Sequence, residues 1–277
     1  MTVREALSRA KENLANSETP YLDALVLAAA SLGVSKDKIL AMYPEPFPDG
    51  NLKTYLAMLE RRGQGDPVAY ITGSKEFWGM NFAVGPGVLI PRPDTETIVE
   101  QALEYAGDKD TFDGTILDLC TGSGCIACAL AKELPAARIY ASDISEKALE
   151  YARKNIADLA LPVTLLSSDL YQRTEGRFDM IVTNPPYVTE DEYRHLQLEV
   201  KKEPISALVS GEDGLDIIRR IISEGFERIT TGGYLCIEAS PPQADEIGAC
   251  MTERGFAGIT YTKDLAGNVR VISGRRP

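Results

Sequence analysis

The stretch Ile116-Leu-Asp-Leu-Cys-Thr-Gly-Ser-Gly-Cys-Ile-Ala127 decides the fold of this chain. Its apolar start predicts a buried strand, Gly122 and Gly124 predict a tight turn, and the apolar residues after Gly124 predict a helix. The two glycines can adopt positive φ and let a ligand approach the backbone closely. A strand that runs through a glycine turn into a helix is typical of a cofactor site in an open α/β sheet.

Predicted strands and helices alternate around this stretch. Strands are expected at residues 115–119, 138–142, 163–167, 178–183, 233–239, 258–263 and 269–273. Helices are expected at residues 125–134, 146–159, 190–198 and 213–229. The alternation predicts an α/β fold, in which a doubly wound, mostly parallel sheet of seven strands ends in a C-terminal antiparallel hairpin.

The first part of the chain is predicted to be mostly helical. Helices are expected at residues 3–14, 21–32, 36–42 and 52–62, and Thr2 with Glu5 has the spacing of a capping box. We therefore expect three parts: a helical domain at 1–75, a bridging segment at 76–110 and the α/β domain at 111–277. The helical domain contains no catalytic constellation, so it either recognises a macromolecular substrate or supports the structure.

The bridging segment contains the loop Leu89-Ile-Pro-Arg-Pro-Asp-Thr-Glu96. Two prolines on either side of Arg92 restrict the backbone, which predicts a stiff loop that positions a neighbouring group. Arg92 is accordingly a candidate for substrate binding or for structural pairing. Asp94 or Thr95 is expected to cap a helix at residues 96–105.

Composition limits the classes of function. The chain has 277 residues, 44% of them hydrophobic, and no apolar run reaches the roughly 18 residues of a membrane span. Its start resembles no signal peptide, so we expect a cytoplasmic protein that makes no membrane contact. The net charge is −12, of which −11 lies beyond residue 80. Extended contact with a nucleic-acid backbone needs a track of Lys and Arg, so no direct nucleic-acid binding is expected.

The cysteines and the single histidine argue against a metal site and against a histidine-dependent hydrolase. Cys125-Ile-Ala-Cys128 has the C-x-x-C spacing, but no second pair follows and the only histidine is His195. We interpret these cysteines as small apolar residues on a buried helix face, and we expect no metal site. One histidine also leaves little room for a Ser/His or Cys/His hydrolase.

Asp118, Asp169 and the motif Asn184-Pro-Pro-Tyr187 favour one nucleoside-containing cofactor over another. Asp143 ends the second strand, 19 residues after Gly124, where a carboxylate can bind both hydroxyls of a ribose. The G-x-G-x-x-A pattern also fits NAD, so an NAD-dependent oxidoreductase is an alternative. Asp118 and Asp169 add negative charge, which would repel a pyrophosphate but suits a sulfonium cofactor. S-adenosyl-L-methionine is therefore favoured, and Leu170 is expected to lie against its adenine.

The tetrapeptide Asn184-Pro-Pro-Tyr187 follows the predicted strand at 178–183. The side-chain oxygen of Asn184 and the carbonyl of Pro185 can accept the two N–H groups of a planar amide or arylamine. The two prolines hold these acceptors in place before a substrate binds, and the ring of Tyr187 can stack on its plane. A Pro-Pro turn that only ends a strand is the alternative without function.

Taken together, these motifs resemble the protein-(glutamine-N5) methyltransferases that modify bacterial peptide-chain release factors. The matching pieces are Tyr70-Ile-x-Gly73, Glu76-Phe77, Leu89 to Glu96, Asp118 to Gly124, Asp143, Asn184 to Tyr187, Glu203-Pro204 with Ala207-Leu208, Asp213 to Leu215, and Gly267-x-x-Arg270. The resemblance covers residues 66–275, and the Pro91–Glu96 loop is its most specific part.

The resemblance implies a class I, Rossmann-like methyltransferase domain after an N-terminal substrate-recognition domain. It implies methyl transfer from S-adenosylmethionine to the glutamine of a release factor's Gly-Gly-Gln motif, which belongs to translation termination. The implied cofactor residues are Asp118, Cys120, Thr121, Gly122, Ser123, Gly124, Asp143, Asp169, Leu170 and Asn184. The implied catalytic residues are Asn184, Pro185 and Tyr187, and these bind the substrate together with Pro186 and Arg92.

Two departures and two rival functions accompany the resemblance. Cys120 stands where the family usually has Gly, and Ala239 follows Glu238 where a Gly is common. The motif at Asn184 is shared with adenine-N6 methyltransferases, so an enzyme acting on RNA or DNA is the main alternative. A non-catalytic interaction protein on a methyltransferase fold is a further one, which the intact Asn184–Tyr187 motif disfavours.

Overall fold

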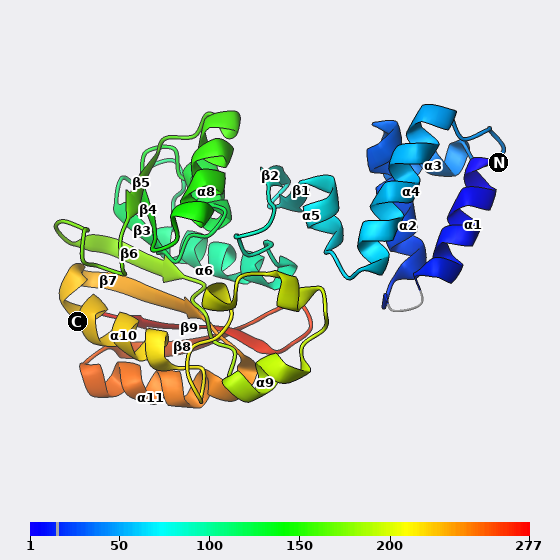
Figure 1. Ribbon diagram of the computed structural model, residues 1–277. Helices are drawn as coiled ribbons and strands as arrows, with labels where there is room; N and C mark the ends of the chain where they lie inside the picture. Colours follow the sequence, from blue (N-terminus) through cyan, green and yellow to red (C-terminus); the bar gives the residue numbers. More distant parts are fainter. Residues whose placement is uncertain (15–16) are drawn as a thin grey trace. The chain divides into compact units, whose positions relative to one another are not determined.

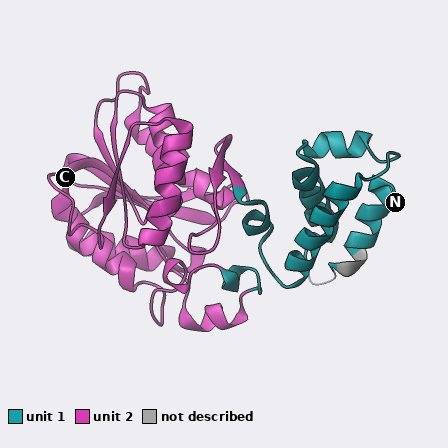
Figure 2. Cartoon of the chain, turned by 45° about the horizontal axis from the view of Figure 1, so that its top comes forward, with its two compact units in different colours: residues 1–74, 197–202 teal, residues 75–196, 203–277 magenta. Residues whose placement is uncertain are grey.

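The chain divides into two compact units in a computed structural model, which describes residues 1–14 and 17–277. Unit 1 comprises Met1–Ser74 and the separate segment Gln197–Lys202, and unit 2 comprises Lys75–Leu196 and Glu203–Pro277 (Figure 2). The segment at 76–110, predicted to bridge two domains, lies entirely in unit 2. Among the described residues, no helix has the length and apolar character that a membrane span requires.

Unit 1 is helical, as predicted (Figure 1). Its helices are α1 (Val3–Asn13), α2 (Pro20–Leu32), α3 (Lys36–Ala41), α4 (Asp49–Gly63) and α5 (Val68–Thr72). The predicted capping box is confirmed, because the Thr2 hydroxyl accepts the N–H of Glu5 and the Glu5 carboxylate accepts the N–H of Thr2. The apolar faces of the helices enclose a separate core that includes Leu7, Leu27, Ile39 and Tyr55.

The segment 197–202 joins unit 1 through a buried cation. Arg62 in α4 has a side chain that is only 8% exposed, and its guanidinium lies 2.7 Å from Asp23 and 2.5 Å from Glu199. A buried guanidinium needs such carboxylate partners, so these ion pairs hold the segment against the helices. No periodicity in residues 197–202 predicts this return of the chain.

Unit 2 is built on a sheet with the strand order β5-β4-β3-β6-β7-β9-β8. Its strands are β3 (Thr115–Leu119), β4 (Arg138–Asp143), β5 (Val163–Ser167), β6 (Phe178–Thr183), β7 (Ile229–Glu238), β8 (Ala257–Lys263) and β9 (Val269–Arg275). All neighbours are parallel up to β7, and β9 runs antiparallel to both β7 and β8. The predicted sheet with its C-terminal hairpin is therefore confirmed.

Helices cover both faces of this sheet (Figure 1). They are α6 (Glu96–Ala106), α7 (Cys125–Glu133), α8 (Glu146–Leu159), α10 (Asp216–Arg228) and α11 (Ala244–Arg254). The short helix α9 (Glu190–His195) follows β6 and has no buried residue. Side chains alternate along β3, so that Ile116 packs in the core with α6 and α7 while Leu117 packs in the core with α10 and α11. Burial on both faces explains the nearly continuous apolar runs of the central strands.

Several local features differ from the sequence-based expectation. Helix α11 and a two-stranded sheet of β1 (Ser74–Phe77) and β2 (Met80–Ala83) complete the architecture, and α11 was not predicted. Thr95 occupies the N-cap position of α6 but makes no capping hydrogen bond, so the predicted cap is wrong. Its hydroxyl is instead bonded to Asn184. The competing tertiary contact takes the hydroxyl away from the helix.

The strand order places the functional motifs together. β3 lies between β4 and β6, and the chain winds away from it in opposite directions on the two sides. The carboxyl ends of these parallel strands therefore meet at a topological switch point, where open α/β sheets bind their ligands.

Candidate active site

A cavity of about 360 Å³ opens at the carboxyl ends of the parallel strands. Its walls include ten of the residues singled out from the sequence: Arg92, Cys120, Thr121, Gly122, Ser123, Asp143, Asp169, Leu170, Asn184 and Pro186. Four others singled out from the sequence are not among its lining residues, namely Asp118, Gly124, Pro185 and Tyr187. Thr95, Ile144 and Arg220 also line the cavity and were not recognised as site residues from the sequence.

The glycine turn leaves room for a ligand. Gly122 has a φ of 57°, and a Cβ added there would meet nothing nearer than Val88 at 4.0 Å. Cys120 has the same φ of 57°, in the left-handed region that disfavours residues with a Cβ. This conformation explains why a glycine would suit position 120, and it places backbone strain directly in the cavity wall.

Asp118 supports the turn from behind. Its side chain is fully buried in β3, and one carboxylate oxygen accepts the Thr121 hydroxyl at 2.5 Å and the Ala127 N–H at 3.1 Å. Burial raises the pKa of Asp118 to about 7, against the opposing effect of these hydrogen bonds. The carboxyl group thus acts on the loop rather than on the contents of the cavity.

Asp143 faces the cavity from the end of β4. Its carboxylate accepts the N–H groups of Gly122 and Ser145, each at 2.9 Å. Burial raises the pKa of Asp143, and these backbone N–H groups oppose the rise. The carboxylate is thereby fixed in direction while its remaining lone pairs can accept the hydroxyls of a ribose.

The turn after β5 carries Asp169 and Leu170. Arg220 from α10 lies 3.1 Å from both carboxylate oxygens of Asp169, so the negative charge expected at this wall is matched by a guanidinium. Leu170 has a φ of 46° and is 6% exposed. The Ser168 hydroxyl donates to the Leu170 carbonyl at 2.8 Å, which holds Leu170 in this conformation as an apolar wall of the cavity.

Asn184 emerges from the end of β6 with its amide already engaged on one side. Its Nδ2 donates to the Thr95 hydroxyl at 3.1 Å, and Thr95 is 2% exposed. The carbonyl of Tyr187 accepts the side-chain N–H of Gln243 at 2.9 Å, which fixes the far end of the tetrapeptide. Burial raises the pKa of Tyr187 to about 12, so its phenol stays neutral.

Ion pairs hold the Pro91–Glu96 loop in place at several points. Arg92 lies 2.5 Å from the buried Glu203, whose second oxygen accepts the N–H of Ile90 at 2.9 Å. Asp94 pairs with Arg270 at 3.1 Å, and the Glu96 carboxylate accepts the N–H of Trp78 at 2.8 Å. The stiffness predicted from the prolines is thus reinforced by charged side chains.

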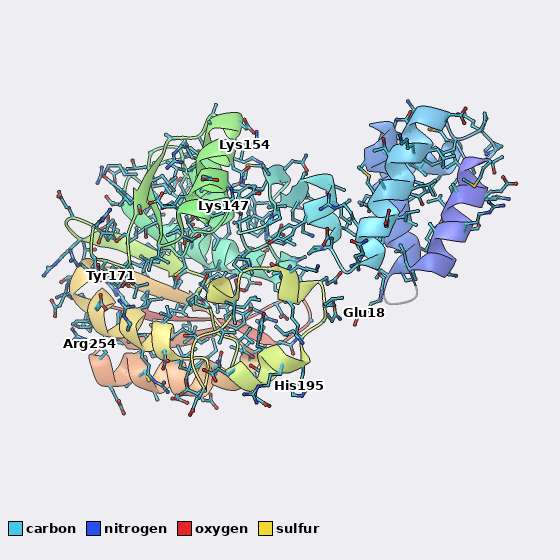
Figure 3. All side chains as sticks on the ribbon, viewed as in Figure 1. Glu18, Lys147, Lys154, Tyr171, His195 and Arg254 are labelled. Atoms are coloured by element: carbon cyan, nitrogen blue, oxygen red, sulfur yellow. The ribbon has the colours of Figure 1, made fainter. Side chains whose placement is uncertain are left out.

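Three further residues were singled out from the sequence, namely His195, Cys125 and Cys128. His195 is exposed on α9, where its ring bonds the Asp191 carbonyl (Figure 3). Cys125 and Cys128 are buried free thiols in α7, as interpreted from the sequence, and burial raises the pKa of each.

These features fit a nucleoside-containing cofactor. The turn at Gly122 has open space where a side chain would protrude, Asp143 offers a directed carboxylate, and Leu170 offers an apolar face.

Comparison with known proteins gives the family. The family model described as the methyltransferase small domain matches residues 99–246, and that of the PrmC N-terminal domain matches residues 5–73. A solved structure of the T. thermophilus 16S rRNA N2 G1207 methyltransferase, in complex with AdoMet and guanosine, has a TM-score of 0.55 at 20% identity. The match covers 74% of this chain and 50% of the chain in that structure, and it supports the fold.

Full-length relatives are closer in sequence. The release factor glutamine methyltransferase of Koribacter versatilis is 41% identical over all of this chain and 99% of its own. That of Escherichia coli is 37% identical over 99% of this chain and 97% of its own. Since identity at this level extends over nearly the whole length of this chain and of its relatives, the chain belongs to the release factor glutamine methyltransferase family.

Proposed function

We propose that Asn184 and the backbone carbonyl of Pro185 bind the side-chain amide of a glutamine in a peptide-chain release factor, with Tyr187 against its plane. The reaction is that of the family, the S-adenosylmethionine-dependent methylation of the amide nitrogen. The glutamine of the Gly-Gly-Gln motif is the proposed acceptor. This reaction belongs to translation termination, and we place it in the cytoplasm, where release factors act.

The observation that carries this proposal is the placement of Asn184. It lies at the carboxyl end of β6, lines the cavity, and has its NH2 end occupied by Thr95. The oxygen end of the same amide is the end left for a ligand. An acceptor at this point is what a substrate NH2 group requires.

The cofactor is proposed to bind beside this acceptor. S-adenosyl-L-methionine supplies an electrophilic methyl group on a sulfonium. Asp143 would accept the ribose hydroxyls, Leu170 would pack against the adenine, and the turn from Cys120 to Gly124 would lie along the rest of the molecule. Asp118 contributes to binding indirectly, because it holds the turn through Thr121.

The residues of the site act on the substrate by placement and polarisation. An amide nitrogen is a poor nucleophile because its lone pair is delocalised. Hydrogen bonds from its two N–H groups to Asn184 and Pro185 move electron density toward the nitrogen and fix its position for in-line attack. The methylated nitrogen then loses a proton to solvent, since an N-alkylated amide cation is strongly acidic. No side chain is required as a base.

The helical unit is proposed to recognise the release factor. Residues 5–73 match a domain model of this family. Its helices and the segment 197–202 offer a surface of their own for a protein partner. Arg92 is proposed to position the Pro91–Glu96 loop for the substrate through its ion pair with Glu203.

Incubation of the purified chain with labelled S-adenosylmethionine and either a release factor or RNA tests the proposed substrate. We expect label in the release factor alone, and mass spectrometry should locate one added methyl group on its glutamine. Label in adenine of the RNA would instead support the adenine-N6 alternative. The net charge of −11 beyond residue 80 argues against that outcome.

A further inference from the structure

One side-chain amide joins three loops of unit 2. Gln243 ends the short 3-10 turn Pro241–Gln243, which follows β7, and it is partly buried. Its Nε2 donates to the carbonyl of Tyr187 at 2.9 Å and to the carbonyl of Asp213 at 3.0 Å. Its Oε1 accepts the N–H of Ser240 at 3.3 Å. The amide therefore connects the end of the tetrapeptide after β6 with the loop before α10 and with its own turn.

The partners of this amide allow only one orientation. A backbone carbonyl can only accept a hydrogen bond, and a backbone N–H can only donate one. The NH2 group of Gln243 must therefore face the two carbonyls, and its oxygen must face Ser240. Since both hydrogens of the NH2 group are used, a side chain without donors cannot replace Gln243 at either carbonyl.

The peptide unit that follows Tyr187 is held at both of its polar groups. Its carbonyl accepts from Gln243, and its N–H, which belongs to Val188, donates to the carbonyl of Leu208 at 2.8 Å. Because a peptide unit is planar, bonds on both sides fix the direction in which the chain leaves Tyr187. The two prolines before Tyr187 restrict the backbone from the other direction.

Gly214 leaves the space that this contact needs. Its φ is 77°, and a Cβ added there would lie 2.1 Å from the Tyr187 carbonyl oxygen and 2.5 Å from the Gln243 Nε2. A side chain at position 214 would therefore push the loop away from the tetrapeptide or push the Gln243 amide out of its place. The close approach of the two segments requires glycine at this position.

We propose that Gln243 is a positioning residue for methyl transfer, which holds the Tyr187 end of the substrate-binding tetrapeptide through the contact that Gly214 permits. This inference deepens the proposed function and rests on it. Gln243 is not among the residues that line the cavity, so its effect passes through the backbone. Asn184 and the Pro185 carbonyl can meet the two N–H groups of one substrate amide only while the segment after them keeps its direction.

Replacement of the NH2 group tests the proposal in the full-length protein. Gln243→Glu keeps the shape of the side chain and an acceptor for the Ser240 N–H, but it turns an oxygen toward two carbonyls. We expect kcat for a release factor to fall by about 10-fold or more, because the acceptors of the tetrapeptide lose their fixed placement. The KM for the release factor and the Kd for S-adenosylmethionine, measured by calorimetry, should change little, since Gln243 contacts neither.

A pair of glycine variants separates this contact from backbone strain in general. Gly214→Ala and Gly176→Ala add a methyl group at nearly the same φ, 77° and 76°. A Cβ at Gly176 meets no atom of the described residues within 4 Å, whereas a Cβ at Gly214 displaces the Gln243 amide from the Tyr187 carbonyl. We expect Gly214→Ala to lose kcat as Gln243→Glu does, and Gly176→Ala to keep the kcat of the parent.

Hydrogen exchange, followed by NMR, reports the same contact without turnover. The Val188 N–H should exchange slowly in the parent, because it is bonded to Leu208 in a segment held by Gln243. In Gln243→Glu it should exchange about 10-fold faster or more, since the segment opens more easily. The Thr121 N–H, which donates to the Ser142 carbonyl in the glycine turn, should keep its rate.

These readouts distinguish failure of the inference from failure of the proposed function. If the parent methylates no release factor but Val188 exchanges faster in Gln243→Glu, the proposed function fails and the hold of Gln243 on the tetrapeptide stands. A Gln243→Glu variant with the kcat of the parent, or with unchanged exchange at Val188, would overturn the inference. If that variant is too unstable for assay, equal kcat values for Gly214→Ala and Gly176→Ala would overturn it in the same way.

Discussion

The guanidinium of Arg92 lies 2.5 Å from one carboxylate oxygen of Glu203, while the other oxygen accepts the N–H of Ile90 at 2.9 Å. The Glu203 side chain is 1% exposed and that of Arg92 is 35% exposed. A single buried carboxylate thus holds both a side chain and the backbone of the loop that carries Thr95. Loss of the cation would leave a buried charge with less compensation, so the pair is expected to be strongly coupled.

A double-mutant cycle with Arg92→Met and Glu203→Gln measures this coupling. Gln keeps an acceptor for the Ile90 N–H but removes the charge, so the two changes together should cost less than their sum. We expect a coupling free energy of at least about 1 kcal/mol from urea unfolding. Additive effects would show instead that Arg92 is free to act on the substrate directly.

Asp118→Asn should stabilise the protein at alkaline pH. Burial raises the folded-state pKa of Asp118 from 3.8 to about 7, so its favourable contribution is complete below 3.8 and is lost as the pH rises through about 7. The variant avoids that loss, and its free energy of unfolding should exceed that of the parent by about 1 to 4 kcal/mol near pH 8. The difference should vanish near about pH 4, and a difference independent of pH would contradict the assignment.

The strain at Cys120 predicts opposite effects for two substitutions. Cys120→Gly relieves the left-handed backbone and should raise the free energy of unfolding by up to about 1 kcal/mol with S-adenosylmethionine binding retained. Cys120→Val places a β-branched residue at a φ of 57° and should lower both stability and cofactor affinity. Thermal unfolding with and without cofactor checks both. Equal stability of the two variants would show that the turn relaxes without cost.

Asp143 should contribute to cofactor affinity in steps. Asp143→Asn keeps one acceptor for the backbone but loses the carboxylate, and should weaken S-adenosylmethionine binding by about 10-fold. Asp143→Ala also frees the N–H groups of Gly122 and Ser145, and should weaken it further. Titration calorimetry gives both values, with His195→Ala on the exposed helix α9 as control. An Asp143→Ala variant that binds as tightly as the parent would remove Asp143 from the site.

The fold was largely predictable because its signals are local. The central strands are short apolar runs, the helices between them have capping residues and apolar faces, and the glycine turn after β3 marks the switch point. Helix α11 was missed because it begins directly after Pro241, Pro242 and Gln243, where two prolines favour a loop over a helix. The return of residues 197–202 to unit 1 depends on Arg62, which shows no sign in the sequence of being buried.

The site was predictable only as far as its motifs extend. The glycine turn, Asp143 and the Asn184–Tyr187 tetrapeptide are continuous patterns, and ten predicted residues line one cavity. Thr95 looked like a helix cap because it precedes α6, yet its hydroxyl bonds Asn184, which is 89 residues away in the chain. Arg220 could not be assigned to Asp169 from the sequence for the same reason. Such pairings arise from the tertiary fold, so no spacing of residues along the sequence predicts them.

The most direct test of the account is methyl transfer by Asn184→Ala. In a single-turnover reaction with S-adenosylmethionine and a purified release factor, mass spectrometry should find the glutamine methylated by the parent chain. The variant should transfer the methyl group about 10²-fold more slowly or worse, with its Kd for S-adenosylmethionine within about threefold of the parent. Methylation by Asn184→Ala at nearly the parent rate would contradict the claim that Asn184 binds the substrate amide.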